Sequence, residues 1–369
     1  MRRTPHRRTA LLLAAGLALA ALTSCGGSGP ASPTGSSAYL TFSGRTSADP
    51  PLPVGFEDQL FATEHDASGG TLTTTFTWDA VTPNVATIDS DGVMHALAPG
   101  TATFRATASD GTTGTYALAT ATATAGTTAQ YGNNTEFGEP TDSDSTDDYI
   151  VSRPEYTLSY NPTRGEPNWV SYDLDASQFG SRERCDCFTF DPALPATFTH
   201  LTTEDYTGSS TAAGYPIDRG HMVRSYDRTS GALDNATTYY LSNIVPQTAD
   251  LNQGPWASLE SYLGDLAQSQ DKEVYIIAGA TGDKGTLKGE GKVVIPTELW
   301  KVAVVMPRDE GLTDVQSPSD VQIVAVIMPN QTGIRSVDWH TYETTVAAVE
   351  TSSGYDLLSK LPAGILAGR

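Results

Sequence analysis

Short runs of alternating apolar and polar residues fill the chain from residue 38 to residue 118. Alternation at every second position is the pattern of a half-buried β-strand. Glycine-containing pairs that favour turns separate the runs, among them Asp91-Gly92, Pro99-Gly100 and Asp110-Gly111. The runs lie at 72–78, 85–88, 93–97, 101–108 and 115–118. No amphipathic helix of useful length interrupts them, so this part is predicted to be an all-β sandwich.

A different pattern covers the remainder of the chain, where longer apolar runs alternate with segments of helical spacing. Residues Leu259, Leu263 and Leu266 repeat at the spacing of one helix face. A second helix is predicted over 342–350, ended by the Ser353-Gly354 pair. The apolar runs predict buried strands at 169–174, 274–278, 293–295, 301–306 and 321–328. The mixture predicts an α+β domain rather than a regular alternation of strand and helix.

The first 24 residues have the pattern of an export signal. Four arginines, Arg2, Arg3, Arg7 and Arg8, precede an apolar run over 10–22. That run is shorter than the ~20 apolar residues that a membrane-spanning helix needs. A basic start before a short apolar run is instead typical of a secretory signal peptide.

The apolar run ends in Leu22-Thr23-Ser24-Cys25-Gly26, which resembles a bacterial lipobox. The resemblance implies that residues 1–24 are removed, that Cys25 is lipidated and that 25–37 form a flexible tether. The protein is then expected to be exported and anchored to a membrane of the cell envelope, at its periplasmic face or at the cell surface. The alternative is an ordinary cleavable signal with an incidental cysteine.

Charge and composition narrow the function classes. The 369 residues carry a formal net charge of −21, which argues against a protein that grips nucleic acid through a broad basic face. Sixteen Tyr, ten Phe and five Trp exclude a disordered chain. Beyond Cys25 the cysteines are Cys185 and Cys187. Export permits a disulfide between them, but the ring is very small, so a bridge and two free thiols both remain open.

The residues best suited to catalysis or to metal binding lie between 218 and 260. His221 has the pKa class of a general base near neutral pH. Arg219 creates a setting that attracts phosphate, because a guanidinium donates two parallel hydrogen bonds to phosphate oxygens. Gly220, between them, allows a substrate to come close.

Asn252 and Glu260 add oxygen donors, which suit a hydrated Mg²⁺ ion. If a helix begins near Asn252, Glu260 lies ~80° past two full turns, so both side chains would face one site. A base, a guanidinium and a hydrated hard cation together suit the hydrolysis of a phosphodiester. Taken singly, each residue has an ordinary structural explanation, and only the spacing of the set points to a site.

The chain resembles two known families, each in a different part of the sequence. One resemblance is to the bacterial immunoglobulin-like group 2 domains, and it implies such a domain over 38–118. It rests on Trp78, 85–89, Gly92-Val93 and 98–102. The string Asp218-Arg219-Gly220-His221 resembles the signature of the DNA/RNA non-specific endonucleases, which have the ββα-metal (His-Me finger) core. The segments 240–247 and 250–256 match that family at the right separation. The nuclease domain is expected over 133–369, after a linker at 119–132.

The second resemblance implies a role for each site residue. His221 would be the general base, and Asn252 the direct protein ligand of a hydrated Mg²⁺, or of Mn²⁺ in its place. Glu260 would hold the waters of the metal and assist the leaving group. Arg219 would contact phosphate, and Asn243 would support the base and the metal site. The family also has an upstream arginine, for which Arg184 is predicted and Arg182 is the alternative. Asp218 is expected to be structural, and no organic cofactor is expected.

These expectations combine into an exported, lipid-anchored, Mg²⁺-dependent hydrolase that cleaves DNA and RNA without base specificity. An alternative is a surface adhesive protein with an inactive nuclease-like domain, and a third is a phosphodiesterase for another ester. The oligomeric state is not predicted.

Overall fold

The computed structural model describes residues 38–127, 129–362 and 364–366. The export signal, Cys25 and the tether therefore lie outside the described residues. Residues Ala38–Arg369 belong to one compact unit. Within the described part, no helix combines the length and the hydropathy that a bilayer crossing requires.

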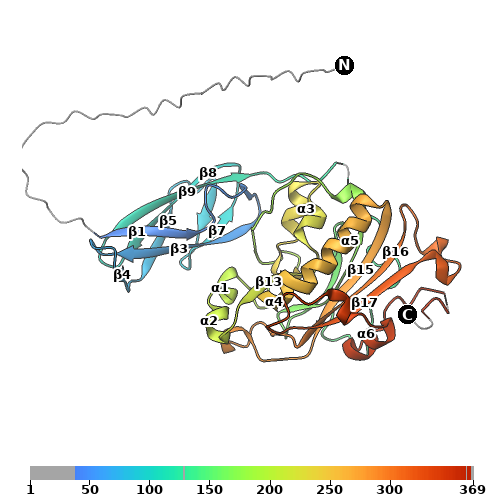
Figure 1. The fold of residues 1–369 in the computed structure, drawn as a ribbon. Helices are drawn as coiled ribbons and strands as arrows, with labels where there is room; N and C mark the ends of the chain where they lie inside the picture. The colour runs from blue at the N-terminus through green and yellow to red at the C-terminus, as the bar shows by residue number, and fades with distance from the viewer. Residues whose placement is uncertain (1–37, 128, 363, 367–369) are drawn as a thin grey trace, which may run out of the picture. The chain divides into compact units, whose positions relative to one another are not determined.

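The N-terminal part is a sandwich of two β-sheets, as the alternating pattern predicts (Figure 1). One sheet has the strand order β1-β3-β7-β6, with β4 beside β3, and the other has the order β2-β9-β8-β5. Leu60, Met94, Phe104 and Leu118 fill the space between them. The strands are β1 Tyr39–Gly44, β2 Leu52–Pro53, β3 Glu57–His65, β4 Thr71–Leu72, β5 Phe76–Ala80, β6 Ala86–Ile88, β7 Val93–Ala96, β8 Gly100–Ala108 and β9 Thr113–Ala121.

An antiparallel six-stranded sheet of order β10-β11-β12-β15-β16-β17 forms the centre of the C-terminal part. Four of the five predicted buried strands lie in it. The fifth, at 293–295, is wrong, because its backbone bonds irregularly to residues 284–287 and forms an isolated bridge between Val294 and Thr286 rather than a strand. The strands are β10 Tyr149–Ser152, β11 Thr157–Asn161, β12 Glu166–Leu174, β15 Lys272–Thr281, β16 Glu298–Pro307 and β17 Gln322–Pro329.

Helices cover both faces of this sheet (Figure 1). On one face, Leu259 and Leu263 of α5 pack with Ile276 and Ala303. On the other face, Val349 of α6 packs with strand residues of the opposite parity. The helices are α1 Thr203–Tyr206, α2 Ser209–Ala213, α3 Ala232–Thr237, α4 Ala249–Leu251, α5 Ala257–Ser269 and α6 Val346–Ser353.

The last helix ends as predicted and begins later than predicted. Thr345 caps α6, because its side chain accepts a hydrogen bond from the backbone of Ala348. The preceding turn, Trp339–Tyr342, is a separate 3-10 helix. Gly354 closes α6 with φ +83°, a left-handed conformation that favours glycine.

Candidate active site

A two-stranded ribbon holds the signature residues. Strand β13 (Ile217–His221) pairs antiparallel with β14 (Ile244–Thr248), and His221 lies opposite Ile244. A Cβ atom on Gly220 would lie 2.3 Å from the side-chain carbonyl carbon of the buried Gln247, so a larger residue here would displace that side chain. The chain passes directly from β14 into α4. Residues 222–243, which include α3, separate the two strands along the chain, and the helical segment follows the second strand at once.

The helical segment that follows is not straight. It begins at Ala249, because Thr248 rather than Asn252 is the N-cap, and its side chain accepts from the backbone of Leu251. The next turn, Asn252–Trp256, is π-helical and contains Gly254 at φ −116° and ψ −115°. The helix predicted after Leu251 is present, but this turn interrupts it, so the angle of ~80° that a regular helix would place between Asn252 and Glu260 does not apply.

The physical cause of this kink is close packing against another backbone. A Cβ atom on Gly254 would lie 2.6 Å from the carbonyl oxygen of Arg335. Pro255 follows, and it has no N–H to donate. The glycine lets the two segments touch, and α5 begins afresh after the proline.

A cavity of about 370 Å³ opens beside the β13–β14 ribbon. Three of the predicted site residues line it: Arg184, Arg219 and Asn252. Arg182, the alternative for the upstream arginine, lines a different cavity. The geometry thus favours Arg184, although its role in catalysis stays a prediction. The whole lining consists of Arg184, Asp186, Phe188, Thr203, Tyr206, Thr207, Ile217, Asp218, Arg219 and Asn252.

Two aromatic rings and two guanidiniums surround this part of the site. The His221 ring packs edge-on against Tyr239, with centroids 4.8 Å apart, and lies 5.4 Å from Phe188. The guanidinium of Arg219 also lies over Phe188, 4.0 Å from the ring centroid. A second guanidinium, that of Arg184, lies 5.6 Å from the ring centroid of Tyr239.

These surroundings keep His221 neutral. The residue as a whole is half-buried, but its Nε2 atom is buried and has no hydrogen-bond partner among the described residues. Burial lowers the pKa of His221 to about 3, and the positive charges of Arg184 and Arg219 add to the effect. A neutral imidazole retains a lone pair, so it can accept a proton.

Asn243 and Asp218 hold the site in shape. The Asn243 amide donates to the carbonyl oxygens of Val223 and Thr238, and its oxygen accepts from the backbone of Val223. These bonds fix the chain just after His221. The Asp218 carboxylate accepts 2.8 Å hydrogen bonds from the side-chain amides of Asn252 and Gln253. Both sets of contacts suit the supporting roles predicted for these residues.

The donors around Asn252 fit a hydrated cation. Because its amide nitrogen donates to Asp218, the amide oxygen is the atom left for a metal. An oxygen donor in a polar cavity, with room for water, suits Mg²⁺. Glu260 lies apart from the cavity lining, and its carboxylate forms a buried 3.2 Å ion pair with Lys301. Burial raises the pKa of Glu260, although the Lys301 ammonium opposes this shift.

Comparison with known proteins places this geometry in a family. The family described as DNA/RNA non-specific endonuclease matches residues 133–364, and the bacterial Ig-like domain (group 2) matches residues 46–119. The chain belongs to the DNA/RNA non-specific endonuclease family. It is therefore a nuclease, a hydrolase of a metal-dependent family, carrying an Ig-like domain, and both resemblances seen in the sequence are confirmed.

Individual relatives agree. A nuclease of Nostoc sp. is 39% identical over 220 residues, which is 59% of this chain and 76% of that protein. A nuclease of Serratia marcescens is 37% identical over 177 residues, 47% of this chain and 64% of that protein. Human mitochondrial endonuclease G is 32% identical over 172 residues, so the match spans 42% of this chain and 54% of that protein.

A solved structure shares the fold. The crystal structure of the EndoG/EndoGI complex aligns with a TM-score of 0.51 at 24% identity, covering 63% of this chain and 92% of that one. This likeness supports the α+β nuclease fold that the sequence predicts.

Sequence reasoning about the endonuclease site missed Lys301. It lies in β16 on the same face as Leu299 and Ala303, because alternate strand residues share a face, and this face packs on α5. Its ammonium lies 4.2 Å from the ring centroid of Trp256 as well as beside Glu260. A lysine inside an apolar strand is unusual, and that signal was present in the sequence.

The protonation state of His221 is directly measurable. In the full chain, NMR signals of the His221 ring, assigned with a His221→Phe variant, should remain those of neutral imidazole down to about pH 5, because burial and two guanidiniums disfavour the cation. In an Arg184→Met variant the ring should take up its proton at higher pH. A wild-type ring that titrates near the ordinary value of ~6.5 would contradict this account.

The Asp186 carboxylate should compete with the substrate phosphate for the Arg184 guanidinium. This carboxylate lies 3.2 Å from the Arg184 guanidinium, and both side chains are exposed. Asp186→Asn should raise kcat/KM for DNA roughly two- to fivefold at low salt, the effect of removing an exposed charge pair. The matched control is Asp271→Asn, since Asp271 is also exposed and also has a positive φ. Equal gains in both variants would show only a general charge effect.

Proposed function

We propose that this endonuclease hydrolyses phosphodiester bonds of both DNA and RNA in the presence of Mg²⁺, and that it does so outside the cytoplasm, anchored by a lipid at Cys25. One observation carries the catalytic part of the proposal. A neutral histidine lies beside two guanidiniums, and both guanidiniums share a cavity with the oxygen donor Asn252.

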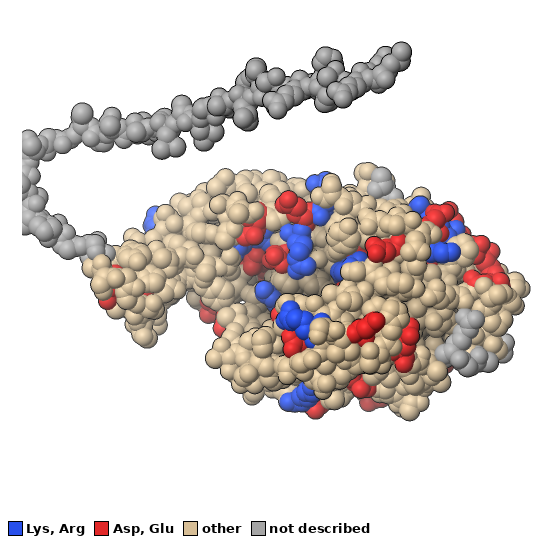
Figure 2. Space-filling view, viewed as in Figure 1, with Lys and Arg blue, Asp and Glu red and all other residues tan. Residues whose placement is uncertain are grey.

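The two arginines account for binding without base specificity. Arg184 and Arg219 are placed to donate to the non-bridging oxygens of one phosphate, a group that every nucleotide carries. Contacts to phosphate position a nucleic acid but carry no sequence information. On the face seen in Figure 2, basic side chains are few and stand among acidic ones. With a net charge of −21, binding then depends on this local site and is weak and sensitive to salt.

His221 is the residue that takes the proton from the attacking water. In the free enzyme its pKa is low, partly because of Arg184 and Arg219. A phosphate bound between these arginines offsets their charge, so the basicity of His221 rises when substrate is present. Phe188 and Tyr239 hold the ring in place meanwhile.

The metal site would be held by Asn252, oriented through Asp218. When bound, Mg²⁺ supplies Lewis-acid stabilisation of the charge that develops on the phosphate and on the leaving oxygen. Glu260, buried and paired with Lys301, is proposed to hold the metal's waters.

The export part of the proposal has separate support. The basic start, the short apolar run and the lipobox-like string of residues 22–26 together favour a lipoprotein signal. Cys185 and Cys187 form a disulfide in the structure, and disulfides persist mainly in oxidising compartments outside the cytoplasm.

Removal of the base and of the metal ligand should have different signatures. In the full-length protein, His221→Ala should lower kcat by ~10²–10⁴, because proton abstraction is lost while the metal ligand stays. Asn252→Ala should raise the Mg²⁺ concentration needed for half-maximal cleavage. His340→Ala, at an exposed histidine, is the control. Cleavage by His221→Ala at the wild-type rate under saturating Mg²⁺ would refute the base assignment.

The anchor is tested by mass spectrometry of protein from its native cell envelope. The mature protein should begin at a lipid-modified Cys25, and Cys25→Ala should shift it from the membrane fraction to the soluble fraction. An unmodified N-terminus beyond Cys25, or an unchanged membrane fraction for Cys25→Ala, would contradict the proposed anchor.

A further inference from the structure

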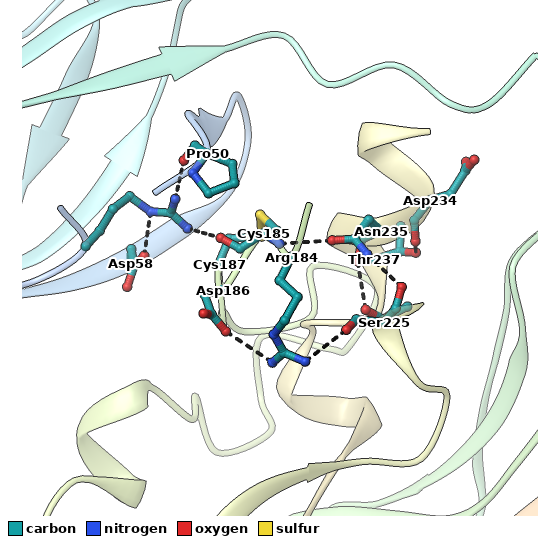
Figure 3. The surroundings of a disulfide bond; sticks show 12 residues. Pro50, Asp58, Arg184, Cys185, Asp186, Cys187, Ser225, Asp234, Asn235 and Thr237 are labelled. Atoms are coloured by element: carbon teal, nitrogen blue, oxygen red, sulfur yellow. Dashed lines mark hydrogen bonds and ion pairs between the residues drawn. A yellow bond between two sulfur atoms is a disulfide. The ribbon is translucent and has the colours of Figure 1, made fainter. Parts of the chain in front are cut away.

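A disulfide closes the loop that joins two parts of the candidate active site. Cys185 and Cys187 are bridged, and the residue between them, Asp186, has a left-handed backbone with φ +47° (Figure 3). Directly before the bridge is Arg184, which lines the active-site cavity, and directly after it is Phe188, which contacts His221. The bridge therefore limits how far the arginine and the aromatic ring can move apart.

The backbone of Cys185 is held from both sides. Its N–H donates to the side-chain oxygen of Asn235 at 2.9 Å, and its carbonyl oxygen accepts from Arg45 Nη2 at 2.5 Å. Asn235 belongs to α3 of the nuclease domain, whereas Arg45 belongs to the Ig-like domain. The residue adjacent to Arg184 thus has anchors in both domains.

The Arg45 side chain is buried and its guanidinium is fixed by several polar contacts. Arg45 is 5% exposed, and its Nε forms a 2.8 Å ion pair with Asp58, which is itself buried. Its Nη1 donates to the carbonyl oxygen of Pro50. Every nitrogen of the guanidinium is thereby used. Residues 38–121 contain only one other arginine, Arg105, which is exposed, and no lysine. A buried arginine with an acidic partner and fixed geometry is a rigid hydrogen-bond donor.

Other contacts keep the Ig-like domain against the same region. The Phe56 ring stacks on Tyr240, with centroids 5.2 Å apart and planes 8° from parallel. The Glu57 carboxylate lies 3.5 Å from His200 Nε2. Cys185, Cys187 and Phe188 belong to one buried cluster with Phe56 and Leu60. Arg45 is therefore supported by a packed apolar contact rather than by a single polar bond.

We propose that Arg45 of the Ig-like domain and the Cys185–Cys187 disulfide are positioning groups for Arg184, so that the Ig-like domain completes the nuclease site. This inference rests on the proposed function, in which Arg184 binds the phosphate. Among the described residues, the exposed Arg184 side chain is held only by 3.2 Å hydrogen bonds to Ser225 and Asp186 and by the Tyr239 ring, whose centroid is 5.6 Å away. Its orientation consequently depends on the neighbouring backbone, which Arg45 and the bridge fix.

The test is a double-mutant cycle in the full-length protein, with a defined DNA duplex and excess Mg²⁺. Arg45→Met/Asp58→Asn removes the buried ion pair as a whole, so that no uncompensated charge remains. It should lower kcat/KM by about tenfold, the scale of a misplaced catalytic contact. In an Arg184→Met background the same change should have less than about a twofold effect. Arg105→Met is the matched control and should match wild type.

Two results would overturn the proposal: equal losses in both backgrounds, or no loss in a variant whose thermal unfolding is cooperative. If Arg45→Met/Asp58→Asn does not fold, Cys185→Ala/Cys187→Ala goes through the same cycle and must show the same dependence on Arg184. Failure of the proposed function is distinct. It would appear as wild-type cleavage by His221→Ala, whatever the Arg45 variants do.

Discussion

The pairing of β13 with β14 is the interaction on which the site depends. It fixes His221 at the end of one strand, and the other strand leads directly into the helical segment that carries Asn252. Glycine at position 220 leaves room for the buried side chain of Gln247 in β14. A larger residue there would displace that side chain from the ribbon that joins the proposed base, His221, to the proposed metal ligand, Asn252.

Electrostatics around this ribbon explain how a very acidic protein can act on a polyanion. The cavity lining carries Asp186 and Asp218 as well as Arg184 and Arg219, so its charge is balanced although the whole chain is strongly negative, and the two guanidiniums lie near His221. The same two charges that attract a phosphate also keep the histidine unprotonated. In the proposed mechanism, a bound phosphate offsets these two charges and so raises the basicity of His221. In this account, the attraction of a phosphate and the control of the basicity of His221 both follow from the positions of Arg184 and Arg219.

Local sequence patterns predicted much of this structure, for identifiable reasons. Alternation in the first domain and apolar runs in the second predicted both classes of fold, because strand periodicity reflects burial directly. The signature around His221 identified the family. The kink at Gly254 was not predictable, since it arises from contact with the backbone of Arg335, far along the chain.

Local sequence patterns also could not predict which residues contact the site residues. The pair of Glu260 with Lys301, and the bond from Arg45 to the Cys185 carbonyl, join residues that only the tertiary fold brings together. Sequence left the two cysteines open between a bridge and free thiols, and the structure contains the bridge. The 293–295 run was buried as expected but made no regular strand, because its backbone bonds irregularly to residues 284–287 and to Arg164.

Chemical rescue tests the central claim most directly. In full-length His221→Ala, added imidazole should restore Mg²⁺-dependent DNA cleavage in proportion to the concentration of its neutral form, since the lost group is a neutral base. The same imidazole should not restore Asn252→Ala, which lacks a metal ligand instead. Stimulation of both variants to the same extent, or wild-type cleavage by His221→Ala without imidazole, would contradict the account.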